Sequence, residues 1–110
     1  MVKLEIKNIK ELPNETLKEQ FTQICNEKRD YLDEYFKKYE KDLTLEVIVN
    51  KDGEIYKVSA SLNMKSKKVL HVEESKDVLA AVTKMLKQFI TEVKRQKELE
   101  RKDYLYKRKR

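Results

Sequence analysis

The segment at residues 75–110 reads SKDVLAAVTKMLKQFITEVKRQKELERKDYLYKRKR, and it predicts one long helix that changes character halfway along. In its first half, apolar side chains recur at steps of three and four, which is the repeat of one buried helix face. They are Val78, Leu79, Val82, Met85, Leu86, Phe89, Ile90 and Val93. Ser75 is the expected N-cap, and Asp77 complements the positive end of the helix dipole.

Basic side chains gather on the opposite face of this predicted helix. At about 100° per residue, six cations fall together there: Lys84, Lys87, Lys94, Arg95, Arg101 and Lys102. The apolar stripe stops after Val93, and Gln96, Lys97 and Glu100 take the positions where it would continue. We therefore expect the helix to run past the body of the domain into a basic tail.

The positive charge of the chain is confined to this end. Residues 94–110 carry nine basic and three acidic side chains, which equals the whole net charge of +6. Residues 1–93 carry 17 side chains of each sign and are therefore neutral. A localised excess of this kind is what a polyanion-binding surface requires.

The rest of the sequence predicts four strands and a second helix. Alternating or β-branched apolar residues indicate strands at residues 2–7, 43–49, 55–62 and 68–73. Asp52-Gly53 between the second and third of these is a strong hairpin signal. An apolar stripe over residues 14–41, with Asn14 as its expected N-cap, predicts the long first helix.

The predicted order is β-α-β-β-β-α, which indicates an α+β domain of two layers with both helices on one face of a four-stranded sheet. We assign residues 1–102 to this single domain. Residues 103–110 form a basic tail, and because a block of like charges repels itself, we expect this tail to be disordered.

Length and composition exclude several classes of protein. A chain of 110 residues predicts one domain that buries about two-thirds of the surface exposed by its unfolded form. No apolar run approaches the roughly 20 residues that cross a bilayer, and the first residues lack the apolar core of a signal peptide. We therefore expect a cytoplasmic protein with no membrane partner.

The sequence offers little for catalysis or for a cofactor. Its single glycine excludes a Gly-rich phosphate-binding loop. His71 is the single histidine, and it has no second histidine or nearby cysteine in the sequence to complete a metal site. Cys25 occupies an apolar helical position, which favours a buried core residue over a reactive thiol. We expect no enzymatic activity, metal, cofactor or small-molecule substrate.

The basic end is the remaining candidate for function, although a solvated helix face with Glu–Lys pairs would have a similar composition. Its tail contributes two aromatics and four cations, which are Tyr104, Tyr106, Lys107, Arg108, Lys109 and Arg110. These aromatics either stack on unpaired bases or fold back on the domain. Lys28 falls inside the apolar stripe of the first helix, where its stem lies on the core or its ammonium contacts a partner.

Several features of the chain carry a resemblance to a known family. They are the element order, the helix end Leu32-Asp33-Glu34-Tyr35-Phe36, the strand end at Glu73, the run Asp77-Val78-Leu79-Ala80-Ala81-Val82, and the lysine-rich end Lys94-Arg95-Gln96-Lys97. In these features, over about residues 2–98, the chain resembles the ribosome hibernation-promoting factors and ribosome-associated inhibitors.

The resemblance implies a fold like the double-stranded-RNA-binding domain and a noncatalytic function. Family members occupy the decoding channel of the small ribosomal subunit, where messenger and transfer RNAs would lie, and keep idle ribosomes inactive under stress. The implied partner is therefore the small subunit with its ribosomal RNA. The family's basic positions carry over to Arg95 and Lys97, and Lys28 matches one in the first helix. The implied form is short, without a carboxy-terminal extension.

The chain also departs from the family pattern, since Gln88, Thr91 and Glu92 stand where relatives tend to place Lys, Arg and Gln. Two other functions remain open on the sequence. One is a general module that binds double-stranded RNA by shape and phosphate contacts. The other is an adaptor whose basic helix face docks on an acidic protein partner.

Overall fold

The structure is a computed structural model that describes the backbone of residues 1–108 and the side chains of residues 1–101. Its elements follow the predicted order with one short 3-10 helix added. They are β1 (Val2–Lys7), the 3-10 helix η1 (Ile9–Glu11), α1 (Glu15–Tyr35), β2 (Leu43–Asp52), β3 (Ile55–Asn63), β4 (Lys68–Ser75) and α2 (Val78–Arg108). The predicted α+β class is confirmed.

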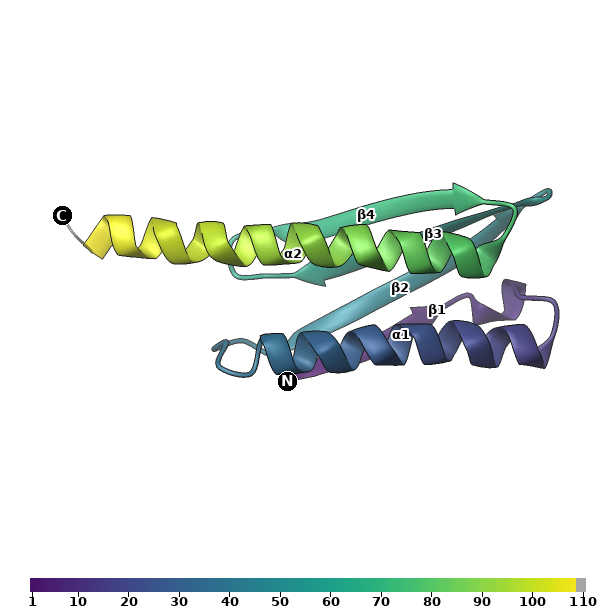
Figure 1. Cartoon of the computed structure of the whole chain (residues 1–110), viewed down its shortest axis with the longest axis horizontal. Coiled ribbons are helices and arrows are strands. Elements are labelled where there is room, and N and C mark those ends of the chain that lie inside the picture. Colours follow the sequence, from purple (N-terminus) through teal and green to yellow (C-terminus); the bar gives the residue numbers. More distant parts are fainter. Residues whose placement is uncertain (109–110) are drawn as a thin grey trace.

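The four strands form one mixed sheet in the order β1-β2-β3-β4. β1 pairs in parallel with β2, beginning at Val2 opposite Leu43, because the α1 crossover returns the chain in the same direction. The β2–β3 and β3–β4 pairs are antiparallel. Figure 1 shows α1 and α2 side by side along the sheet, with α1 near β1 and α2 near β3 and β4.

The core lies between this helical layer and one face of the sheet. Alternate residues of the central strands point into it, and the following are fully buried: Leu45, Val47, Val49, Val58, Ala60 and Leu62. From the helices and the residue after α1 come Phe21, Cys25, Leu32, Phe36, Val82, Met85, Leu86, Phe89 and Val93. Cys25 is a core residue, as predicted, and burial raises the pKa of its thiol to about 12.

The Asp52-Gly53 hairpin is confirmed. Asp52 pairs with Ile55, which leaves a loop of Gly53 and Glu54. Gly53 has φ +62°, a conformation that glycine adopts without the steric cost of a side chain. Pairing also continues beyond the predicted strand end at residue 49, so that β2 reaches Asp52.

The first helix is shorter than the predicted span of residues 14–41. Asn14 is its N-cap, because the Asn14 side chain accepts a 2.8 Å hydrogen bond from the Leu17 amide. The helix ends at Tyr35 rather than residue 41. Beyond it the chain turns so that the Tyr39 ring packs edge-on against Phe36, with ring centroids 4.9 Å apart. Tertiary packing of Tyr39 thus overrides the helical periodicity.

The prediction of Ser75 as N-cap of the last helix was wrong, since Ser75 is the last residue of β4 and pairs with Tyr56. Asp77 caps α2 instead. Its carboxylate accepts hydrogen bonds from the Leu79 and Ala80 amides at 3.1 and 3.2 Å. Ser75 supports this cap, because its hydroxyl accepts a 3.1 Å hydrogen bond from the Asp77 amide.

The helix α2 contains 31 residues, equivalent to about 46 Å at 1.5 Å per residue. It makes the molecule elongated, with principal extents of 55 × 22 × 17 Å, and projects past the end of the sheet (Figure 1). Its backbone is helical through Arg108. The helical assignment thus includes residues 103–108, and residues 109–110 lie outside the described part of the chain. The division into a domain at residues 1–102 and a disordered tail at residues 103–110 stays a prediction.

Candidate nucleic-acid interface

The outward face of α2 is basic, as its sequence predicted. Core contacts fix the rotation of the helix, since Val82, Met85 and Phe89 are fully buried. Lys84 and Lys87 are consequently exposed on the opposite side, and Arg101 is exposed further along. Each of these cations is accessible to a polyanion.

The cations at residues 94–97 divide between two flanks of α2. On the flank toward α1, the Lys94 ammonium lies 4.9 Å from the centroid of the Tyr31 ring. Lys97 lies on the same side, and its ammonium donates a 3.0 Å hydrogen bond to the Tyr35 carbonyl. Arg95 lies on the other flank, beside β4. The basic face predicted for this helix therefore divides at residues 94–97 between two flanks of α2 and does not form a single row.

Two titratable groups on the α1 flank, Lys94 and Tyr35, have shifted pKa values. Proximity to the Tyr31 hydroxyl raises the pKa of the Lys94 ammonium. Burial raises the pKa of the Tyr35 hydroxyl, although Lys94 opposes that shift. Both shifts favour the protonated forms, a charged Lys94 ammonium beside an uncharged Tyr35 hydroxyl.

Lys28 is half-buried within α1. Its helical position lies between the buried residues Cys25 and Leu32, which is compatible with an aliphatic stem along the core edge. A contact between its ammonium and a partner stays a prediction.

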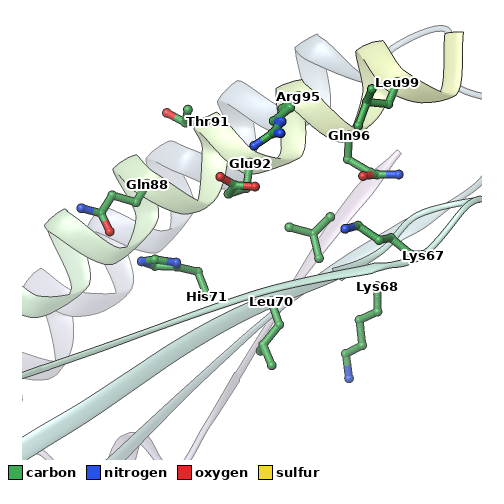
Figure 2. Close-up of a pocket in the computed structure, with 11 residues that line it drawn as sticks. Lys67, Lys68, Leu70, His71, Gln88, Thr91, Glu92, Arg95, Gln96 and Leu99 are labelled. Carbon is green, nitrogen blue, oxygen red and sulfur yellow. The ribbon is translucent and has the colours of Figure 1, made fainter. Parts of the chain in front are cut away.

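A groove of about 660 Å³ separates β4 from the Arg95 flank of α2. Figure 2 shows Arg95 and Gln96 on α2 above the groove, His71 pointing up from β4 toward the helix, and Lys68 and Leu70 pointing away. Its lining from α2 includes Gln88, Thr91 and Glu92. The three positions that depart from the pattern of the resembled family thus all line this flank, and Glu92 lowers its net charge.

The sequence did not reveal how the projecting part of α2 is held. Glu100 accepts hydrogen bonds from the Tyr39 hydroxyl at 2.7 Å, the Ser66 amide at 2.9 Å and the Ser66 hydroxyl at 2.5 Å. Gln96 donates to the Ser66 hydroxyl at 2.7 Å. We call Tyr39, Ser66, Gln96 and Glu100 the polar clamp. It continues the core face of α2 with hydrogen bonds after the apolar stripe ends.

Ionisation of Glu100 strengthens this clamp. Partial burial disfavours the charged carboxylate, but the hydrogen bonds from Ser66 and Tyr39 outweigh burial and hold the pKa of Glu100 below its usual value. Burial, followed by the bond to Glu100, raises the pKa of Tyr39 to about 12. The pair is thus a neutral phenol donating to a carboxylate at physiological pH.

Other predicted contact residues fall where only the backbone is described or beyond it. They are Lys102, Tyr104, Tyr106, Lys107, Arg108, Lys109 and Arg110. The helical backbone through Arg108 extends the direction of α2 across most of them. Their contacts with RNA remain predictions.

The described residues show neither a metal-binding group nor a membrane span. No cluster of three or more His, Cys, Asp or Glu side chains within them is placed to hold a metal ion. His71 instead lies 3.3 Å from the Glu73 carboxylate. Neither described helix combines the length and apolar character that crossing a bilayer requires.

Comparison with known proteins identifies a shared fold. No protein-family model matches the sequence, and no curated protein matches it significantly. The crystal structure of the Thermus thermophilus protein Y N-terminal domain aligns with a TM-score of 0.58 and 22% identity, covering 84% of this chain and 93% of that domain. A ribosomal subunit interface protein from Coxiella burnetii aligns with a TM-score of 0.52 and 15% identity, covering 88% and 97%. The chain therefore has the fold of these two proteins, as the resemblance in its sequence predicted.

Proposed function

We propose that this protein is a noncatalytic ribosome hibernation factor that binds ribosomal RNA in the decoding channel of the small subunit. The observation that carries the proposal is the shared fold, which spans nearly the whole Thermus thermophilus protein Y N-terminal domain. The second neighbour is a ribosomal subunit interface protein. A ribosome-bound role also implies a cytoplasmic location.

The mechanism we propose is steric exclusion. A rigid two-layer domain presents the exposed cations of α2 to ribosomal RNA, where each phosphate neutralised releases condensed counterions and contributes to affinity. Once seated, the body of the domain occupies the space that messenger and transfer RNAs need. Translation is inhibited without a chemical step, so no cofactor or catalytic residue is involved.

Ribosome binding and competition test this proposal. The protein should co-sediment with small subunits and inhibit translation in a reconstituted system. Messenger and transfer RNA together should displace it from small subunits, because all three would occupy one channel. Tight binding to free duplex RNA with no preference for small subunits would instead identify a general double-stranded-RNA-binding module.

A protein partner is the other alternative. If the basic face docks on an acidic protein, ribonuclease treatment should leave its binding unchanged. Loss of binding after ribonuclease treatment supports RNA as the ligand.

A further inference from the structure

A row of aromatic side chains follows the last turns of α1 and the loop after it. Tyr31 and Tyr35 are stacked, with centroids 6.4 Å apart and planes 6° apart. Tyr35 meets Phe36 edge-on at 5.3 Å, and Phe36 meets Tyr39 in the same manner. The i, i+4 spacing of Tyr31 and Tyr35 places these two rings on one side of the helix.

Lysine ammonium groups lie against successive members of this row. Lys94 is 4.9 Å from the Tyr31 centroid and 5.7 Å from that of Tyr35. Lys97 is 4.2 Å from the Tyr35 centroid, and Lys65 is 4.7 Å from that of Tyr39. Aromatic rings alternating with cations are what proteins use to bind single-stranded nucleic acid, because bases stack on the rings while phosphates meet the cations.

Exposure separates Tyr31 from the rest of the row. Phe36 is 1% exposed and belongs to the core, whereas Tyr31 is 43% exposed. Lys97 is fixed by its hydrogen bond to the Tyr35 carbonyl, while Lys94 is exposed at the open end of the row. Tyr31 therefore offers an open ring surface to a ligand, which the buried ring of Phe36 does not.

From this geometry we infer that Tyr31 stacks on one unpaired base of the bound RNA and that Lys94 binds the phosphate beside that base. The inference rests on the proposed function for its ligand, ribosomal RNA, and adds a specific contact on α1. The distribution of basic side chains did not indicate this contact, because Tyr31 is not one of them. The energetic source is base–aromatic stacking, which tolerates any base identity.

Fluorescence provides a direct test, since the chain contains no tryptophan. The Tyr31→Trp variant introduces a single indole at the proposed stack, and small subunits should quench its emission. Val72→Trp is a matched control, because Val72 has a similar exposure of 39% but lies on the sheet face that the helices leave open. Its emission should change little.

Affinity measurements complete the test. Tyr31→Leu should weaken binding to small subunits about tenfold, which is typical of losing one stacked base, while Tyr31→Phe should bind like the wild type. Circular dichroism should show both variants folded. Full affinity of Tyr31→Leu together with unquenched Tyr31→Trp would overturn the stack while leaving ribosome binding intact.

A short polyuridine RNA separates the two proposals. If the protein does not bind small subunits but this RNA quenches Tyr31→Trp, the stack stands and the proposed function fails. If neither ligand binds, both are overturned.

Discussion

The Tyr39 hydroxyl donates a 2.7 Å hydrogen bond to the Glu100 carboxylate, although the two residues are 61 positions apart. Ser66 donates to the other oxygen of the same carboxylate. Glu100 thus joins α2 to the loop after α1 and to the turn between β3 and β4. Hydrogen bonds at this point replace the apolar packing that positions the first half of α2.

Removing the Glu100 carboxylate should destabilise the contact of α2 with Tyr39 and Ser66. We expect Glu100→Ala to lower the free energy of unfolding by about 1–2 kcal/mol, because the donors on Tyr39 and Ser66 lose a charged acceptor. Amide hydrogen exchange should accelerate in residues 96–101 more than in the core. Glu98→Ala is the matched control, since Glu98 is exposed on the same helix. Equal behaviour of the two variants would contradict a clamping role.

The clamp should also depend on pH. Hydrogen bonds from Ser66 and Tyr39 depress the folded-state pKa of Glu100 below its ordinary value, so the carboxylate binds protons more readily in the unfolded state. Its stabilisation is therefore present above the unfolded pKa and is lost as pH falls through the lower, folded pKa. Urea unfolding of the wild type and Glu100→Gln should show a constant difference at neutral pH that shrinks below about pH 4. A difference that grows on acidification would show the opposite shift.

Salt dependence should identify the cations that meet phosphate. In small-subunit binding, replacing Lys84, Lys87 and Arg95 with Gln should lower the log–log salt slope by about 0.7–0.9 for each phosphate that is no longer neutralised. The domain should remain folded, because all three side chains are exposed. Lys3→Gln with Lys57→Gln, on the open face of the sheet, should leave the slope unchanged. If both sets of variants give the wild-type slope, the outward face of α2 is not the RNA-binding surface.

The start of α2 provides a test of helix capping. Asp77→Ala should cost about 1 kcal/mol of stability, because it removes the acceptor for two helical amides. Asp77→Asn should recover most of this loss. Thermal unfolding can compare both with Lys76→Ala at the exposed neighbouring position. An Asp77→Ala variant as stable as Lys76→Ala would show that the cap is not stabilising.

Sequence patterns predicted the elements and the core because both depend on local periodicity. The stripe of α2 and the alternation in β3 each describe one buried face, and the hairpin followed from Asp52-Gly53. Errors occurred where distant residues decide the outcome. Asp77 replaced Ser75 as the N-cap because pairing with Tyr56 holds Ser75 in β4. α1 ends before the predicted residue because the Tyr39 hydroxyl forms hydrogen bonds with the Lys65 amide and the Glu100 carboxylate.

The candidate site was predictable only in part. The distribution of net charge located the basic half of α2. The helical repeat of 3.6 residues predicted that Lys84 and Lys87 lie on the exposed face. Neither could show that Lys94 and Arg95 diverge to opposite flanks, since that depends on what α1 and β4 place beside each. The sequence analysis did not select Tyr31, because the proposed role of Tyr31 depends on its spatial position beside Tyr35 and Lys94. The i, i+4 tyrosine pair was the available signal.

The parallel pairing of β1 with β2 also bears on the order of folding. β2, β3, β4 and α2 are consecutive in the chain and can assemble through short loops, whereas Val2 must find Leu43 across the whole of α1. Closing that longer loop carries a larger entropy cost, so long-range pairing tends to form late. We therefore expect substitutions in the β2–β3 hairpin to slow refolding and those in β1 mainly to accelerate unfolding.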